Sequence, residues 1–151
     1  MADNRALYEQ VILDHNKSPR NFGKMDEANR KADGYNALCG DQFTVYLKMN
    51  DSGTIEDIAF EGAGCAISKS SASVMTTVLK GKTQDEARTI FENFTSMITS
   101  DHDSPIDEDS VGKLKVFGGV REYPVRVKCA TLAWHTLISA LDESQDPVST
   151  E

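Results

Sequence analysis

The chain has 151 residues, of which 39% are hydrophobic and 26% charged, the composition of an ordinary globular protein. Its length fits one domain, and a domain of this size can fold on its own core without a metal. The formal net charge of −8 argues against nucleic acid or an anionic membrane as a partner. The sequence shows no apolar run long enough to span a membrane and no N-terminal signal-peptide pattern, so we expect a cytoplasmic protein.

The first part of the chain predicts one helix and a hairpin. Apolar residues recur every three or four positions over residues 3–16, which indicates an amphipathic helix with Asp3 as its candidate N-cap. The polar stretch 25–38 is interpreted as an irregular connection. Alternating apolar residues over 43–49 predict a strand with one buried face, and a turn then leads into a second strand at 54–61.

Two helices are expected after the hairpin. Gly62 and Gly64 end the second strand, and a helix rich in small residues follows at 65–79. Thr83 and Glu86 have the spacing of a capping box, which predicts the start of the next helix. An acidic segment at 100–110, which contains His102, is interpreted as an exposed loop.

The last part of the chain predicts a short helix at about 109–117 and a long one from Pro124 to Leu141, with proline in its first turn. We expect a single domain over residues 1–143 and a polar, frayed tail over 144–151. These elements together describe an α+β domain in which a hairpin lies among helices.

The three cysteines stand where loops meet strands or helices, in the stretches Leu38-Cys39-Gly40-Asp41, Gly62-Ala63-Gly64-Cys65 and Lys128-Cys129-Ala130-Thr131. Three thiols cannot all pair in disulfides, and in a reducing compartment such a set more often binds a metal or reacts. With Asp41, which lies on the same side of an extended segment as Cys39, they offer the four sulfur and oxygen ligands that zinc takes. The alternative is that each cysteine is only a small buried residue, but the combination favours a metal site.

Charged neighbours of these cysteines support the metal interpretation. Three thiolates and a carboxylate around one zinc ion leave an excess of negative charge. Arg126, on the helical face of Cys129, and Lys128 beside it are predicted to offset that charge. His15 near the end of the first helix is interpreted as a packing residue, because the four other donors already complete a tetrahedral site.

Four motifs are distributed over almost the whole chain. They are Val11-Ile12-Leu13-Asp14-His15 with Ser18-Pro19-Arg20-Asn21, Cys39-Gly40-Asp41, Phe60-Glu61-Gly62-Ala63-Gly64-Cys65-Ala66-Ile67-Ser68, and Val127-Lys128-Cys129-Ala130-Thr131-Leu132. Together they resemble the motifs of the U-type iron-sulfur assembly proteins, the IscU/NifU-like family. The resemblance implies the SufE/NifU fold of that family, an α+β fold in which a small antiparallel sheet is packed by several α-helices.

Within the family the chain is similar to the zinc-dependent SufU branch. Scaffolds of the IscU type typically have histidine immediately before the third cysteine and a Leu-Pro-Pro-Val-Lys segment upstream. Here Lys128 precedes Cys129, and the upstream segment is Glu122-Tyr123-Pro124-Val125-Arg126. The stretch between Cys65 and Cys129 is also longer than in the scaffolds, as in SufU proteins.

The resemblance implies a sulfurtransferase that accepts persulfide sulfur from a SufS-type cysteine desulfurase and relays it to the downstream iron-sulfur assembly machinery. It also implies that zinc is held by Cys39, Asp41, Cys65 and Cys129, and that Cys39 is the catalytic sulfur acceptor. Two alternatives stay open. One is an IscU-type scaffold that carries a transient iron-sulfur cluster, and the other is a noncatalytic zinc module that only activates a desulfurase.

Overall fold

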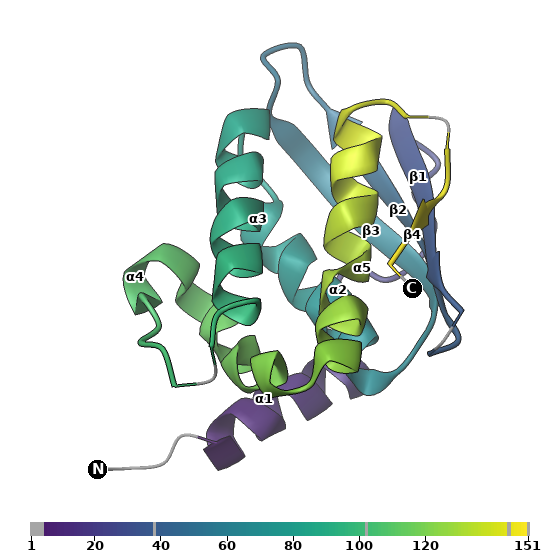
Figure 1. The fold of residues 1–151 in the computed structure, drawn as a ribbon. Helices are drawn as coiled ribbons and strands as arrows, with labels where there is room; N and C mark the ends of the chain where they lie inside the picture. The colour runs from purple at the N-terminus through teal and green to yellow at the C-terminus, as the bar shows by residue number, and fades with distance from the viewer. Residues whose placement is uncertain (1–4, 38, 102, 145, 151) are drawn as a thin grey trace.

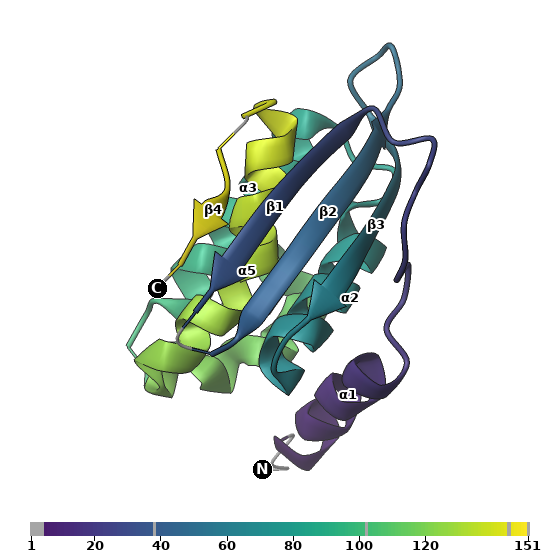
Figure 2. The ribbon, with the colours of Figure 1, turned by 90° about the vertical axis from the view of Figure 1, so that its right-hand side faces the viewer.

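The computed structural model describes residues 5–37, 39–101, 103–144 and 146–150, and its main layers are a sheet and the helices that cover one face of it (Figures 1 and 2). The expected N-cap Asp3 and the loop residue His102 lie outside the described residues. The elements follow the chain as α1 (Arg5–Lys17), β1 (Arg30–Asn36), β2 (Asp41–Met49), β3 (Ile55–Ala63), α2 (Ala66–Leu79), α3 (Gln84–Ile98), α4 (Glu108–Val111), the 3-10 helix η1 (Gly112–Glu122), α5 (Pro124–Leu141) and β4 (Val148–Ser149).

The sheet has the strand order β3-β2-β1-β4. Strand β2 is antiparallel to both β1 and β3, and β4 is parallel to β1. The predicted hairpin of β2 and β3 and the α+β fold class are therefore confirmed. The register pairs Asn36 with Asp41 and Gln42 with Ala63, so the end of β1, the start of β2 and the end of β3 meet at one end of the sheet.

Strand β1 corrects the expectation of an irregular connection at 25–38. Its side chains alternate between exposed and buried, but the buried positions hold Ala32, Gly34 and Asn36 in place of large apolar residues. The sequence therefore lacked the apolar alternation that predicts a strand. Small residues are needed because β1 lies close to α5. A Cβ atom on Gly34 would lie 2.0 Å from Oγ1 of Thr136.

Helix α5 is central to the helical layer, because it packs against β1 and β2 on one side and against α2, α3 and η1 on the other. Its predicted bounds, with proline in the first turn, are confirmed. The capping box of Thr83 and Glu86 at the start of α3 is also confirmed. The largest fully buried side chains of this layer are Trp134, Phe94 and Phe117.

Two further expectations need correction. The short helix expected at 109–117 is instead one turn of α-helix, α4, followed by the 3-10 helix η1, which continues to Glu122. The polar tail at 144–151 is not uniformly frayed, because Val148 and Ser149 pair with Gly34 and Tyr35 of β1. Backbone pairing with an exposed sheet edge needs no apolar pattern, so no local pattern predicts this strand.

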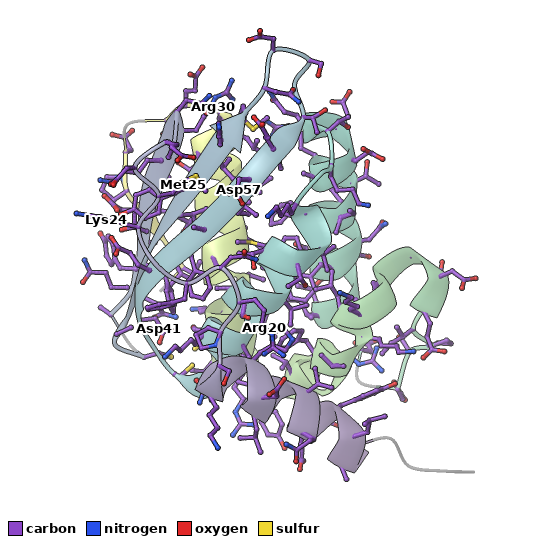
Figure 3. All side chains as sticks on the ribbon, turned by 180° about the vertical axis from the view of Figure 1, so that it is seen from behind. Arg20, Lys24, Met25, Arg30, Asp41 and Asp57 are labelled. Carbon is purple, nitrogen blue, oxygen red and sulfur yellow. The ribbon has the colours of Figure 1, made fainter. Side chains whose placement is uncertain are left out.

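The chain between α1 and β1 crosses the outer face of the sheet, where Figure 3 labels Lys24 and Met25. The backbone N–H of Gly23 donates to the carbonyl of Phe60 at 2.8 Å, and Asn29 donates to the carbonyl of Met49 at 2.8 Å. This segment thereby attaches α1 near one end of the sheet. Among the described residues, no helix combines the length and the apolar character needed to cross a bilayer.

Candidate metal centre

Asp41 is the first residue of β2 and is only 2% exposed. Its Oδ1 accepts a hydrogen bond of 2.8 Å from the backbone N–H of Cys65, and its Oδ2 accepts one from the hydroxyl of Ser68. Figure 3 shows Asp41 at the end of the sheet near α1. The sheet register thus places this carboxylate at the positive N-terminal end of α2, where a negative charge is stabilised.

Two glycines allow β2 and the start of α2 to approach this closely. Gly62 has a φ of +134°, and a Cβ atom there would lie 2.1 Å from the carbonyl oxygen of Gln42. A Cβ atom on Gly64 would lie 2.7 Å from Oδ1 of Asp41 and 2.9 Å from the ring of Phe43. The sequence indicated these glycines only as the end of a strand, whereas the structure shows that Gly62 makes room for the backbone of β2 and Gly64 for the buried carboxylate.

Cys65 is the N-cap of α2, as the sequence predicted for a cysteine at a helix N-terminus. Its Sγ accepts the backbone N–H of Ser68 at 3.4 Å and lies 4.0 Å from Oδ2 of Asp41. An N-cap side chain of this kind satisfies one of the free N–H groups of the first helical turn. The sulfur is therefore fixed both by the helix and by the carboxylate beside it.

Cys39 and Cys129 come from two other parts of the chain and lie near Asp41. Cys39 lies in the turn between β1 and β2 and is partly exposed, whereas Cys129 lies in α5 and is only 2% exposed. Both are free thiols, and their Sγ atoms are 2.9 Å apart. Ligand atoms of Cys39, Asp41 and Cys129 lie within 4.8 Å of one another, and Cys65 adjoins this trio through Asp41.

The environment of Cys129 disfavours a thiolate in the metal-free protein. Burial raises the pKa of the Cys129 thiol above its usual range, and the contacts with Cys39 and Cys65 and the charge of Asp41 raise it further. Crowded, buried, negatively charged groups are costly unless a cation compensates them. A divalent cation is therefore the natural partner of this group.

The donor chemistry fits zinc, which is bound in fours by thiolate and carboxylate ligands. None of the ion pairs found among the described residues includes Asp41, although its carboxylate is buried. Its two hydrogen bonds satisfy the oxygens in part but bring no positive charge. Cys39, Asp41 and Cys129 therefore form a potential metal site, and the part of Cys65 as a fourth ligand stays a prediction.

The predicted supporting charges lie beside this group on the exposed start of α5. The guanidinium of Arg126 lies over the ring of Tyr123, with Cζ 4.7 Å from the ring centroid. Lys128 is exposed, and its backbone carbonyl accepts a hydrogen bond from Thr150 at 3.2 Å. Neither contact joins the charge to a cysteine or to Asp41, so their role in charge compensation stays a prediction.

His15 has the packing position that the sequence suggested. Its Nδ1 lies 2.7 Å from the hydroxyl of Ser73 on α2. Burial lowers the pKa of His15, with a smaller contribution from the positive charge of Arg20. This contact joins helices α1 and α2.

The roles of two residues near Asp41 were not predicted from the sequence. Ser68 contacts the carboxylate of Asp41, and Gly64 makes room for it. For Ser68 a signal did exist, since it stands three residues after Cys65, the spacing at which an N-cap side chain meets a helical N–H. No such local signal existed for the contact with Asp41, 27 positions away.

Fold and site together define a class of small α+β proteins in which three thiols and one carboxylate meet at the end of a sheet. A family described as "NifU-like N terminal domain" matches residues 7–130. The chain therefore belongs to the NifU-like N-terminal domain family, which comprises the SufU/IscU-type proteins of iron-sulfur cluster assembly. The resemblance seen in the sequence motifs is thereby confirmed.

Curated relatives of both branches are similar to the chain. The zinc-dependent sulfurtransferase SufU of Bacillus subtilis (strain 168) is 41% identical over 132 residues, which cover 87% of this chain and 86% of that protein. The iron-sulfur cluster assembly scaffold protein IscU of Thermotoga maritima is 36% identical over 143 residues, 95% of this chain and 98% of that protein.

A solved structure has the same fold. It is the putative iron-sulfur cluster assembly scaffold protein for the SUF system from Fervidobacterium islandicum AW-1. The TM-score is 0.81 at 37% sequence identity, and the match covers 92% of this chain and 99% of that one. The likeness therefore extends over nearly all of both chains.

Proposed function

We propose that this protein is a zinc-dependent sulfurtransferase that accepts persulfide sulfur from a SufS-type cysteine desulfurase and relays it for iron-sulfur cluster assembly. The observation that carries the proposal is the difference in access within the cysteine group. Cys39 is partly exposed in a turn, while Cys129 is buried beside it in α5. The similarity to the B. subtilis sulfurtransferase supports the same function.

In this proposal zinc is held by Cys39, Asp41, Cys65 and Cys129. When bound, it supplies positive charge that keeps the thiols deprotonated. The chain's own residues then decide which sulfur reacts. Cys65 is fixed as the N-cap of α2, whereas Cys39 precedes Gly40, whose φ of +71° glycine adopts without strain. Cys39 is therefore the sulfur that can reach a partner with the least rearrangement.

The proposed reaction is the transfer of a sulfur atom from a persulfide to a thiolate. The Cys39 thiolate attacks the outer sulfur of the desulfurase persulfide, and a new S–S bond forms on Cys39. The S–S bond of the desulfurase breaks, and its cysteine leaves as a thiolate. Attack by a thiolate on a sulfur–sulfur bond is the general course of such exchanges, and no external oxidant or reductant is consumed.

Mass spectrometry can test this assignment directly. The protein would be incubated with a SufS-type desulfurase and cysteine, alkylated, and digested. We expect one additional sulfur atom on the peptide that contains Cys39. Additional sulfur on Cys65 or Cys129, with Cys39 unmodified, would contradict the proposal. A reaction without cysteine is the control for sulfur that was already bound.

The scaffold function is the second candidate, because the T. maritima scaffold protein matches almost the whole chain. The two functions differ in what the isolated protein contains. A sulfurtransferase should contain one zinc per chain and have no visible absorption. Iron with acid-labile sulfide in an anaerobic preparation would instead support a scaffold.

The third alternative, a noncatalytic zinc module, has its own signature. Such a module would raise the turnover of the desulfurase, yet no cysteine of this chain would gain sulfur. Desulfurase turnover and the mass of the alkylated chain should therefore be measured in the same reaction. Sulfur on Cys39 that appears and then decays as an acceptor thiol is added would exclude the module.

A further inference from the structure

Ser68 is joined to three residues of the candidate metal centre. Its hydroxyl contacts Oδ2 of Asp41 and lies 3.0 Å from the backbone carbonyl oxygen of Cys129, and its backbone N–H donates to Sγ of Cys65 at 3.4 Å. Ser68 itself is 1% exposed. It thus connects β2, α2 and α5 at the point where the metal ligands meet.

The hydroxyl has one proton and two neighbouring acceptors, so it donates to one of them at a time. A carboxylate is the stronger acceptor, because a hydrogen bond to an ionised group is about twice as strong as a neutral one. The carbonyl of Cys129 belongs to helix α5, where backbone N–H groups bond to such carbonyls. The Ser68 proton therefore goes to Asp41.

A carboxylate oxygen has two lone pairs, so Oδ2 can accept the Ser68 proton and still offer a second lone pair to a metal ion. Oδ1 accepts the N–H of Cys65. Both oxygens of Asp41 are thus oriented by the first turn of α2, and Oδ2 lies 4.0 Å from Sγ of Cys65. Rotation of the carboxylate would break one of these bonds within the buried interior.

We propose that Ser68 is a positioning residue for the metal site, and that its hydroxyl holds Oδ2 of Asp41 beside the cysteine sulfurs. The inference rests on the proposed function only through the metal site, because it assigns no role in sulfur transfer to Ser68. In the Ser68→Ala variant, Oδ2 loses its donor at a place that solvent does not reach. Removal of such an outer partner of a metal ligand typically lowers metal affinity by about 10–100-fold.

Ser71 provides a matched control one helical turn further along α2. It is fully buried, and its hydroxyl donates to the carbonyl of Ala130 on α5 at 2.6 Å. It also accepts the indole N–H of Trp134 at 3.2 Å. Ser71→Ala therefore removes a buried serine contact between α2 and α5, and its described hydrogen bonds do not involve the metal ligands.

The test is a set of zinc dissociation constants measured by competition with a chromophoric chelator. The proteins are the parent, Ser68→Ala, Ser71→Ala, Asp41→Ala and the double variant Ser68→Ala/Asp41→Ala. We expect Ser68→Ala to weaken zinc binding by about 10–100-fold. Ser71→Ala should stay within about twofold of the parent, and Ser68→Ala should add no more than about twofold to Asp41→Ala.

The non-additivity of the two substitutions is the measurement that a purely structural role would not produce. If Ser68 only stabilised the fold, its effect would persist in the Asp41→Ala protein, and that result would overturn the proposal. Cobalt-substituted protein gives a spectroscopic check. The d–d bands of Ser68→Ala should shift toward those of Asp41→Ala, while those of Ser71→Ala should match the parent.

The outcomes separate this inference from the proposed function. Sulfur transfer by the parent with unchanged zinc affinity in Ser68→Ala would overturn the inference alone. Weaker zinc binding in Ser68→Ala together with a parent that accepts no sulfur would support the inference and overturn the sulfurtransferase. A parent that binds no zinc would overturn both.

Discussion

Two regions around α5 are held together by different kinds of contact. The aromatic cluster of Phe91, Phe94, Phe117 and Trp134 joins α3, η1 and α5. In it Phe94 stacks on Trp134 with ring centroids 4.8 Å apart and meets Phe117 edge-on at 6.1 Å. The serine contacts of Ser68 and Ser71 join α2 to α5 and to Asp41 through directed hydrogen bonds.

The comparison indicates which contacts stabilise the fold and which position the atoms of the candidate metal site. The rings of the aromatic cluster remove a large apolar area from water, and this hydrophobic effect is non-directional, so the cluster should contribute most to the free energy of unfolding. Hydrogen bonds contribute less energy but fix the positions of individual atoms. The Ser68 contact with Asp41 should therefore determine metal affinity, and metal affinity and stability should respond separately to substitution.

The largest effect is expected from Phe94→Ala in the aromatic cluster. Phe94 is fully buried, and its removal should lower the free energy of unfolding of the metal-free protein by about 3–5 kcal/mol. Zinc affinity of the folded protein should stay within about twofold of the parent. Urea denaturation and chelator competition measure the two quantities. Phe94→Leu, which leaves a smaller cavity, serves if the alanine variant does not fold.

Gly64→Ala should instead lower zinc affinity strongly and stability less. The new Cβ would lie 2.7 Å from Oδ1 of Asp41, so the carboxylate must shift. We expect zinc affinity to fall about 10–100-fold and stability by about 1–3 kcal/mol. Gly119→Ala is the control, since a Cβ there meets nothing within 4 Å. Parent-like zinc binding in Gly64→Ala would remove Asp41 from the metal site.

Acid should weaken the protein through two histidines, His135 beside the aromatic cluster and His15 between α1 and α2. His135, edge-on to Phe91, has its pKa lowered by burial from the ordinary value of 6.5, and burial is also the main cause that lowers the pKa of His15. Since the unfolded chain binds these protons more readily, stability is complete above pH 6.5 and falls as the pH drops through the folded pKa values.

Each histidine contributes no more than about 1.4 kcal/mol per pH unit to this slope. His135→Gln and His15→Gln should each flatten the acid side of a plot of unfolding free energy against pH. Urea denaturation of the metal-free protein between pH 7 and pH 5 measures the slope. A slope that is the same in both variants and in the parent would show that other groups cause the acid sensitivity.

The smallest effect is expected from the exposed charges near the site. Lys128→Gln should raise the zinc dissociation constant by about two- to fivefold at low salt, because an exposed charge contributes about 0.2–1 kcal/mol. The effect should fade at high ionic strength. Arg126→Gln should change the zinc dissociation constant by no more than Lys128→Gln does, since the guanidinium of Arg126 lies over the ring of Tyr123. Lys24→Gln in the segment before β1 is the control, and an equal loss there would argue against local charge compensation.

The sequence alone determined the elements whose pattern is local. The apolar alternation of β2, the capping box of Thr83 and Glu86, and the last helix from Pro124 to Leu141 were all predicted and are all confirmed. The four donor residues were also named from the sequence, because their chemical types and motifs are visible without a structure. Periodicity, capping and ligand type are properties of a few neighbouring residues.

Only the tertiary structure decided the contacts between distant positions. It made a strand of β1, whose buried residues are small because α5 lies against them. It placed Cys39 beside Cys129, 90 positions away, and Ser68 against Asp41, 27 positions away. These contacts depend on sheet register and on the packing of α2 and α5, which no local pattern specifies. For that reason the sequence named the candidate ligands, and the fold showed which residue, Ser68, contacts one of them.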